Sequence, residues 1–292
     1  MNEDIPKLDA YKVFGQEAKD YGAQYEEADF TKRYPEHVFR LKIFLKLLSD
    51  AKARRVLDVG CGSGEPLLAF LRAGYDAHGF DYSAEMVEQA QKLLLDNGLD
   101  PNRVRQGNME EIQDVRAGEF DCIVGLGSLY YTRKFQSVIQ KLAGLLPANG
   151  HLIFSLRNEL FSMFSLNAYT ENFFLQDLVP TALMSDDLRQ RFEEYLARRF
   201  RPLGVERKFL TVDDKNVQST YHNPLTIEKE VLRPNGLLLD GISYYHYHAL
   251  PPEFEHSDTE EFRRLSAELE NPSDWRGAIM CSTFVVDARR VV

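Results

Sequence analysis

The sequence has no long apolar run. None of its hydrophobic stretches approaches the roughly 18 residues that a membrane-spanning helix requires. Its first residues, Met1–Pro6, also lack the basic and then apolar order of a secretion signal. We therefore expect a cytoplasmic protein that does not engage a membrane. With 292 residues, 44% of them hydrophobic, the chain suits one large domain or one domain carrying an insertion.

Cysteine is scarce. The three cysteines, Cys61, Cys122 and Cys281, are odd in number and lie far apart in the chain. Neither a disulfide framework nor a zinc site is indicated by this pattern. We predict buried, reduced thiols and no bound metal.

Positive charge is in deficit. Lys and Arg total 35 against 45 for Asp and Glu, which gives a formal net charge of −10. Such a protein repels a polyanion on average, which argues against a nucleic-acid substrate. The basic run at residues 198–201 could still bind an anion, but a solvated basic helix end, favoured by the helix dipole, is the preferred interpretation.

After the first forty residues, strand-like and helix-like segments alternate, which indicates an α/β protein with a mainly parallel sheet covered on both faces. The predicted strands are residues 55–59, 76–80, 104–106, 120–125, 151–156, 236–248 and 278–287. The predicted helices are residues 65–73, 84–97, 135–146, 185–201 and 258–270, with one more that Thr226 caps.

Residues 157–224 interrupt the alternation. A segment this long without a place in the sheet exceeds an ordinary connection, and such insertions usually serve as functional covers. Its helix begins after Ser185 and has an apolar face. The residues of that face are Leu188, Phe192, Tyr195 and Leu196.

The first predicted strand runs directly into a glycine-rich turn, Gly60-Cys61-Gly62-Ser63-Gly64, with Asp58 two residues before it. Glycine tolerates positive φ and has no Cβ, so the backbone here can approach a ligand and point amides at it. Dinucleotide-binding loops read G-x-G-x-x-G, whereas this turn reads G-x-G-x-G. It resembles motif I of the class I S-adenosylmethionine (SAM) dependent methyltransferases. The resemblance implies SAM as the cofactor, S-adenosylhomocysteine (SAH) as the product, and cofactor contacts from these residues.

The resemblance also implies a fold. The family has a Rossmann-like sheet of seven mainly parallel strands, with helices on both faces and a last strand antiparallel between the fifth and the sixth. The match covers residues 40–157 by motif and 225–290 by element order. We accordingly expect an N-terminal helical arm or lid (1–40), a SAM-binding core (41–156), a largely helical cap for acceptor binding (157–224) and a segment that completes the core sheet (225–292).

Three further segments match the family's cofactor contacts. Asp81 and Tyr82 end the second strand about 20 residues beyond Asp58, where a carboxylate accepts hydrogen bonds from both ribose hydroxyls. A plain acid at a helix N-terminus is the alternative. Asn108 and Met109 would meet adenine, although many relatives carry Asp in place of this Asn, and a simple turn is the alternative. The fourth strand ends near Leu126 and passes under the methionine part in the family.

Two motifs of other methyltransferases are absent. The strand end at residues 124–130 lacks the Asn/Asp-Pro-Pro-Tyr tetrad of enzymes that methylate amino groups of nucleic-acid bases and of glutamine. The paired glutamates of arginine methyltransferases are also missing. Together with the acidic charge, these absences favour a small-molecule acceptor.

Methyl transfer from a sulfonium is an in-line displacement, and the protein supplies alignment, exclusion of water and, for a hydroxyl acceptor, a base. Histidine suits that role near neutral pH. Strand alternation places Tyr244, His246 and His248 on one face at a carboxyl strand end, where ligands bind in open parallel sheets. His246 and His248 are therefore candidate bases, with packing of an edge strand as the alternative.

Three more residues are candidates. Arg157 directly follows the fifth strand and could hold an anionic acceptor, while His222, just before Pro224, could address the acceptor or pin the cap. Tyr21 belongs to an aromatic arm that is expected to fold over the cofactor and shield its sulfonium by cation–π attraction. Core packing explains the arm's spacing of Tyr21 and Tyr25 equally well.

The leading hypothesis is thus methyl transfer from SAM to oxygen or nitrogen of a small, potentially anionic metabolite, sugar or natural-product precursor. A SAM-binding regulatory or scaffold protein without turnover is the second hypothesis, and a nucleic-acid methylase the third. The oligomeric state stays open between a monomer and a homodimer.

Overall fold

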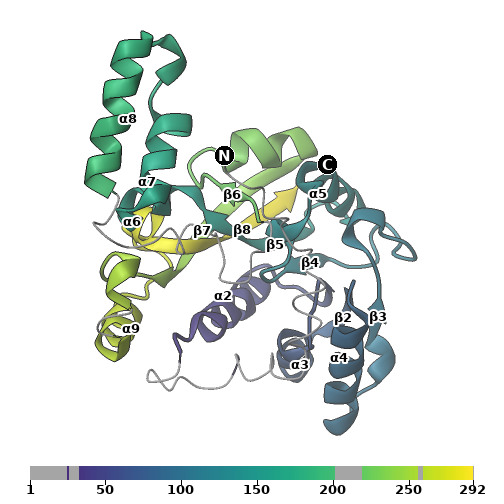
Figure 1. Cartoon of the computed structure of the whole chain (residues 1–292). Helices are drawn as coiled ribbons and strands as arrows, with labels where there is room; N and C mark the ends of the chain where they lie inside the picture. Colours follow the sequence, from purple (N-terminus) through teal and green to yellow (C-terminus); the bar gives the residue numbers. More distant parts are fainter. Residues whose placement is uncertain (1–24, 26–32, 201–218, 256–258, 292) are drawn as a thin grey trace.

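One sheet forms the centre of the structure, with strands in the order β3-β2-β1-β4-β5-β8-β7 and the short β6 paired to β5 (Figure 1). The computed structural model describes residue 25 and residues 33–200, 219–255 and 259–291. The strands are β1 (Arg55–Val59), β2 (Asp76–Asp81), β3 (Val104–Gln106), β4 (Cys122–Gly125), β5 (His151–Asn158), β6 (Tyr221–His222), β7 (Leu237–Tyr247) and β8 (Cys281–Arg290). The α-helices are α2 (Glu36–Asp50), α3 (Glu65–Arg72), α4 (Ala84–Asp96), α5 (Phe135–Leu145), α6 (Ser162–Ser165), α7 (Ala168–Phe173), α8 (Asp186–Phe200), α9 (Thr259–Glu268) and α10 (Gly277–Met280).

The strand directions confirm the predicted class I fold. β8 runs antiparallel between β5 and β7, and the other pairs are parallel. The carboxyl ends of β1, β2, β4, β5 and β7 therefore meet at one edge of the sheet. In open parallel sheets, ligands bind beyond this edge.

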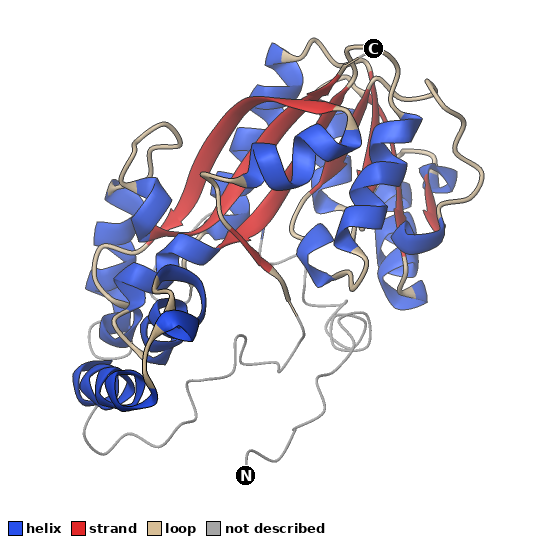
Figure 2. Cartoon of the chain, turned by 90° about the horizontal axis from the view of Figure 1, so that it is seen from above, coloured by secondary structure: helices blue, strands red, loops and turns tan. Residues whose placement is uncertain are grey.

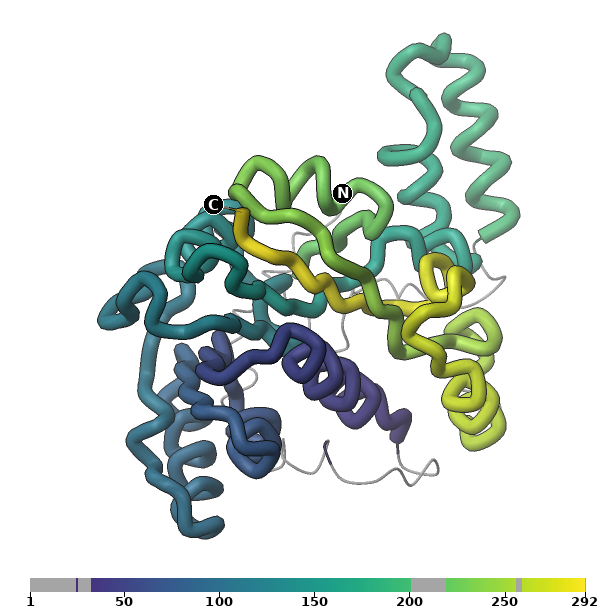
Figure 3. Tube along the Cα trace, turned by 180° about the vertical axis from the view of Figure 1, so that it is seen from behind, coloured from purple at the N-terminus to yellow at the C-terminus, as the bar shows by residue number. Residues whose placement is uncertain are grey.

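Helices cover both faces of the sheet (Figure 2). On one face, a buried cluster joins α2, α3 and α4 to the strands through residues such as Phe44, Leu67 and Leu94. On the other face, α5 contributes Val138 and Leu142 to a second cluster. Alternation along the strands feeds both clusters, since successive strand residues point to opposite faces. Seen from behind, α2 lies beside the strands β7 and β8 (Figure 3).

The three cysteines are buried and free, as predicted. Burial raises the pKa of each thiol. In the described part of the chain, no helix combines the length and apolarity needed to cross a membrane.

The helices of the cap project beyond the sheet (Figure 1). Leu188 donates its backbone N–H to the Ser185 hydroxyl, so Ser185 is the N-cap residue of helix α8, as predicted. The apolar face of α8 is buried only in part, because Leu196 is 2% exposed whereas Tyr195 is 52% exposed. Residues 201–218 of the cap lie outside the described residues.

Four local expectations need correction. β6 was not foreseen, and it extends the sheet to eight strands by pairing with Arg157 and Asn158 of β5. The last strand begins at Cys281 because α10 occupies the preceding residues. The boundary placed at residue 40 falls inside α2.

The fourth correction concerns the helix expected after Thr226. Residues 228–232 form a π-helical turn and residues 233–235 a 3₁₀ turn, and no side chain caps the segment. Pro234 lacks a backbone N–H and so prevents a regular α-helix from continuing here.

Candidate functional site

The glycine turn has the left-handed backbone that its sequence requires. Gly60, Gly62 and Gly64 have φ values of 74°, 56° and 93°. A Cβ on Gly60 would lie 2.5 Å from the Cβ of Ser128, and one on Gly64 would lie 2.9 Å from the Cβ of Ala90. The turn is therefore packed between the loop after β4 and helix α4. Such a turn exposes backbone to a ligand.

Cys61 contributes backbone to this site rather than its thiol. The side chain is 4% exposed and packs on Gly79 of β2, where an added Cβ would come within 2.9 Å of the Cys61 Cβ. Burial raises the pKa of the thiol well above its usual value, so it stays protonated. The Cys61 amide is bonded to the Phe80 carbonyl, which ties the turn to the end of β2.

Asp81 links the turn to the second strand end. One carboxylate oxygen accepts the Gly62 backbone N–H at 2.9 Å, and the other accepts the Ser83 N–H at 2.9 Å. Burial raises the pKa of this carboxyl. Each carboxylate oxygen has a second lone pair, so acceptor capacity remains for ribose hydroxyls. The neighbouring Tyr82 is 48% exposed.

The third segment also adjoins the turn. The Asn108 side chain accepts a hydrogen bond from the Glu110 N–H at 2.9 Å and caps a 3₁₀ turn. The Met109 methyl lies 3.4 Å from the position of a Gly60 Cβ. The simple turn considered for Asn108 is thus present, and it sets the Met109 side chain beside the glycines. Leu126 is 6% exposed and packs in the core, so only its backbone can face the cofactor.

Asp58 is the unusual group at this edge. Its side chain is fully buried, and among the described residues neither carboxylate oxygen has a hydrogen-bond partner. Burial, with the charge of Asp81, raises the pKa of Asp58 to about 8, against the opposing charge of Arg40. A buried carboxylate without a partner is costly unless a donor is supplied to it. The α-ammonium group of SAM is such a donor, so the residues present fit this cofactor.

Arg40 of α2 is the positively charged side chain that acts on the Asp58 carboxylate. Its guanidinium donates to the Tyr25 hydroxyl at 2.9 Å and lies 2.7 Å from Nδ1 of His37. It also fills the space that a Cβ on Gly127 would need. The sequence analysis overlooked Arg40, although its position one helical turn after His37 was a usable signal.

Tyr25 is the one residue of the aromatic arm's tyrosine pair that the structure describes, and Tyr21 lies outside the described residues. Burial raises the pKa of Tyr25 to about 12, and the charges of Glu65 and Asp58 act on it in the same direction. This residue of the arm is therefore close to the glycine turn.

The two candidate histidines lie side by side. Their rings stack with centroids 4.9 Å apart, and Tyr34 stacks on the far side of His246, also at 4.9 Å. The predicted shared face with Tyr244 is wrong. Tyr244 packs against the cluster on the α5 face, whereas His246 meets Tyr34 at the start of α2. The reason is the φ of 62° at His246, which interrupts strand alternation one residue before β7 ends at Tyr247.

Both rings are neutral at physiological pH. Burial lowers the pKa of His246 to about 4, and it lowers the pKa of His248 well below the usual value. His248 is 7% exposed, and neither ring nitrogen has a hydrogen-bond partner in the part of the chain that the structure describes. Its ring lies between Phe161 and Phe262, at 4.6 and 5.6 Å. The rings of Phe161 and Phe262 thus form an apolar box around His248. Buried polar groups usually have a hydrogen-bond partner, so a polar group of a ligand would fit beside this imidazole.

Arg157 reaches the same region from the end of β5. Its guanidinium lies over the rings of Tyr130, Tyr131 and Tyr221 at 5.2, 5.9 and 6.0 Å. Its positive charge contributes to the low pKa of His246, which places the two groups near one another. The structure thus brings Arg157 together with the histidine pair.

His222 stands apart from this group. Its ring packs on Phe135 of α5 at 4.3 Å, and its Nε2 lies 3.2 Å from the Thr220 hydroxyl. Burial lowers the pKa of His222 to about 4. These contacts favour the interpretation that His222 pins the end of the cap.

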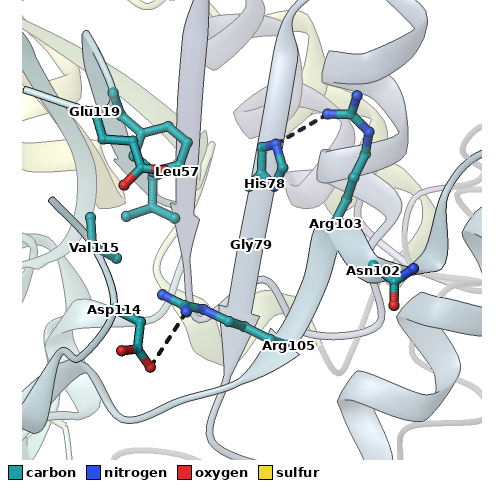
Figure 4. A pocket seen from close by; sticks show the side chains of 10 residues that line it. Leu57, His78, Gly79, Asn102, Arg103, Arg105, Asp114, Val115 and Glu119 are labelled. Atoms are coloured by element: carbon teal, nitrogen blue, oxygen red, sulfur yellow. Dashed lines mark hydrogen bonds and ion pairs between the residues drawn. The ribbon is translucent and has the colours of Figure 1, made fainter.

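A separate cavity of about 180 Å³ lies against the sheet beside Leu57 and His78, away from the carboxyl edge (Figure 4). Its charged walls are paired: Arg103 contacts Asp76 at 2.6 Å, and Arg105 lies 3.9 Å from Asp114. This cavity is therefore not the expected SAM site. Among the described residues, no group of three or more His, Cys, Asp or Glu is arranged to hold a metal.

Comparisons with known proteins agree with this geometry. The family described as "Methyltransferase domain" matches residues 30–207. A stretch of 132 residues is 30% identical to the ubiquinone biosynthesis O-methyltransferase of Pectobacterium atrosepticum and covers 45% of this chain and 54% of that protein. The enzyme of the same name from Bordetella avium is 28% identical over 158 residues, which are 54% of this chain and 63% of that protein. The chain thus spans about half the length of the curated relatives it matches.

Solved structures share the fold at low identity. Magnesium protoporphyrin IX methyltransferase from Synechocystis PCC 6803, crystallised with SAH, has a TM-score of 0.55 at 15% identity, covering 96% of this chain and 97% of that one. A chain from the complex of the Haloferax volcanii Trm112 methyltransferase activator and a methyltransferase has a TM-score of 0.56 at 14% identity, covering 98% and 99%. The family match spans more than half of the chain, and the sheet has the order expected from the glycine motif. The chain therefore belongs to the methyltransferase domain family, and its fold is that of the class I SAM-dependent enzymes.

Proposed function

We propose that this protein transfers a methyl group from SAM to a hydroxyl oxygen of a small molecule. The observation that carries the proposal is Asp58, a buried carboxylate without a partner beside a glycine turn. The relatives are named as O-methyltransferases, which supports oxygen as the acceptor atom. The net charge of −10 supports a small molecule over a nucleic acid.

At the cofactor end, this chain binds and orients. Asp58 accepts the α-ammonium group, the amides of the glycine turn line the amino-acid part, and Asp81 accepts the ribose hydroxyls. Met109 offers its thioether side chain to the adenine ring. When bound, SAM supplies an electrophilic methyl on a sulfonium. Arg40 and Tyr25 close this end on the side of α2 and keep water away.

At the acceptor end, His248 is the proposed partner of the hydroxyl. Its neutral ring has a free nitrogen lone pair, and its surroundings exclude water. As the new O–C bond forms, the S–C bond to the methyl breaks and SAH is the leaving group, while the hydroxyl proton would pass to this nitrogen and later to solvent. Because the pKa of His248 is held well below the usual value, the transfer is favourable only while the methyl bond is forming. His246 supports its ring, and Arg157 fits an anionic group on the acceptor.

The test is to incubate the purified protein with SAM and a panel of phenols, catechols, aliphatic alcohols, hydroxy acids and amines, and to measure SAH. We expect SAH in an acceptor-dependent amount, and a product whose added methyl mass spectrometry places on oxygen. Tight SAM binding with no SAH from any acceptor would instead support the regulatory or scaffold hypothesis. Methylated amines would move the acceptor atom to nitrogen, and retention on polyanions at low salt would favour the nucleic-acid methylase.

A further inference from the structure

His246 has a backbone conformation that its side chain disfavours. A φ of 62° at a residue with a Cβ is strained and persists only where surrounding contacts enforce it. The residue lies one position before the end of β7, and its ring forms the middle of the stack Tyr34, His246, His248. Something must therefore hold this strand end in place.

Glu270, two residues after the end of α9, makes the contacts that do so. Its Oε1 accepts the backbone N–H of Tyr247 at 2.9 Å and also a hydrogen bond from the hydroxyl of Tyr34. One carboxyl group thus joins the tyrosine on one side of the stack to the strand backbone directly after His246.

We propose that Glu270 is a positioning residue that fixes the His246 ring between Tyr34 and His248. The hydrogen bond from the Tyr247 amide holds the strand directly after the left-handed His246, and the hydroxyl hydrogen bond holds the outer ring of the stack. With its ring fixed, His246 supports the ring of His248 in the apolar box. The link to turnover rests on the proposed function, whereas the link to the His246 ring does not.

The charge around Glu270 makes this clamp sensitive to pH. Burial raises the pKa of Glu270 to about 7, and the nearby charge of Glu36 acts in the same direction. The hydrogen bonds that the carboxyl accepts oppose this rise. The thiol of Cys281 on β8 also faces it, and Arg263 of α9 acts on Glu36. An ionised carboxylate accepts hydrogen bonds more strongly than a protonated carboxyl. The clamp is therefore tightest above pH 7.

Histidine ring NMR of the whole chain with SAH present, from pH 5 to 9, tests the proposal. The chain has seven histidines, and a His246→Asn variant identifies the signal. Because the pKa of His246 is lowered to about 4, its own titration lies below this window. We expect its ring signal nevertheless to shift with a midpoint near pH 7, in step with Glu270. In Glu270→Gln, which keeps an acceptor oxygen, this step disappears. A step that persists unchanged in Glu270→Gln would overturn the proposal.

Two further variants separate positioning from general stability. Glu268→Gln on α9, whose partner is Arg264, is the matched control and keeps the step near pH 7. Tyr34→Phe keeps the stacked ring but loses the hydroxyl, and we expect it to move the His246 signal at every pH.

With an active acceptor in hand, Glu270→Gln should lower kcat about 3- to 10-fold at pH 8 and leave the KM for SAM unchanged. An unaltered kcat together with a lost NMR step would remove the functional link. If the protein turned over no acceptor at all, the proposed function would fail, while the NMR step would still decide the role of Glu270.

Discussion

At the proposed cofactor end of the site, the groups come from three adjacent strand ends and are mostly backbone and short acids, such as the amides at Gly60–Gly64 and the carboxylate of Asp81. The proposed acceptor end is built from large side chains of distant segments: Tyr34, Arg157, His248 and Glu270. The cofactor end tolerates little change of backbone conformation. The acceptor end tolerates little change of side chain. A cofactor shared by a whole family suits the former, while an acceptor that differs between enzymes suits the latter.

The largest effect is expected when the cofactor end loses its bare backbone. Gly62→Val should weaken SAM binding more than 100-fold in calorimetry, because a β-branched side chain at a φ of 56° both strains the turn and blocks the ligand. Gly74→Val is the matched control, since Gly74 also has a positive φ, of 92°, but has nothing within 4 Å of its Cβ position. Equal SAM affinity in the Gly62 variant and the wild type would refute the placement of the cofactor.

Removal of the imidazole at the acceptor end should act on turnover alone. His248→Phe fits the aromatic box but cannot accept a proton, so we expect kcat to fall about 100-fold with the Kd for SAM unchanged. His151→Gln is the control: this histidine bonds to Asp287 at the start of β5, far from the carboxyl edge, and its loss should leave both constants unchanged. Full activity in His248→Phe would send the search for a base elsewhere.

Asp81→Ala should have the opposite effect and act on SAM binding rather than on turnover. It removes charge-assisted hydrogen bonds from the ribose and from the Gly62 amide, so SAM affinity should fall by about 2 kcal/mol, roughly 30-fold. The acceptor end should keep its pH dependence. Asp76→Ala at the other end of β2 loses contacts with Arg103, Arg55 and His78, and its SAM affinity should match the wild type. A similar loss in both variants would mean that β2 itself is disturbed.

The smallest expected effect is a pH dependence from Asp58. Its pKa is raised to about 8, and only its ionised form pairs with an ammonium group. Between pH 8 and pH 7, SAM affinity should therefore fall up to tenfold, and it should level off above pH 8. Asp58→Asn should flatten this profile. A pH-independent affinity in the wild type would contradict the proposed contact.

The same group affects stability without ligand. Because the folded-state pKa of Asp58 is raised, its favourable contribution is full in acid and is lost as pH rises through about 8. Thermal melts of the ligand-free protein should therefore show Asp58→Asn gaining stability over the wild type at pH 9. At pH 4 the difference should be small.

Much of the fold followed from local pattern. The first and third predicted strands have the observed bounds, and β2, β4 and β5 differ by one or two residues at an end, because apolar runs bounded by glycine and acids mark buried parallel strands. The errors arose where tertiary contacts overrode local preference. β6 is two residues long and exists only because β5 extends beyond β4, and the left-handed His246 reverses an alternation that the sequence alone predicts.

The candidate site divides along the same line. The turn at Gly60–Gly64 and its partner Asp81 lie within one strand-turn-helix unit and the next strand. Their contact could therefore be predicted from short sequence spacings. The role of Glu270 could not, because Tyr34 before the sheet and a loop near the chain's end come together only when the sheet forms. The sequence by itself determined the cofactor loop, since positive φ at closely spaced positions requires glycine. Only the tertiary structure decided which side chains surround the acceptor, since burial and hydrogen bonds across more than two hundred residues of chain depend on the assembled fold.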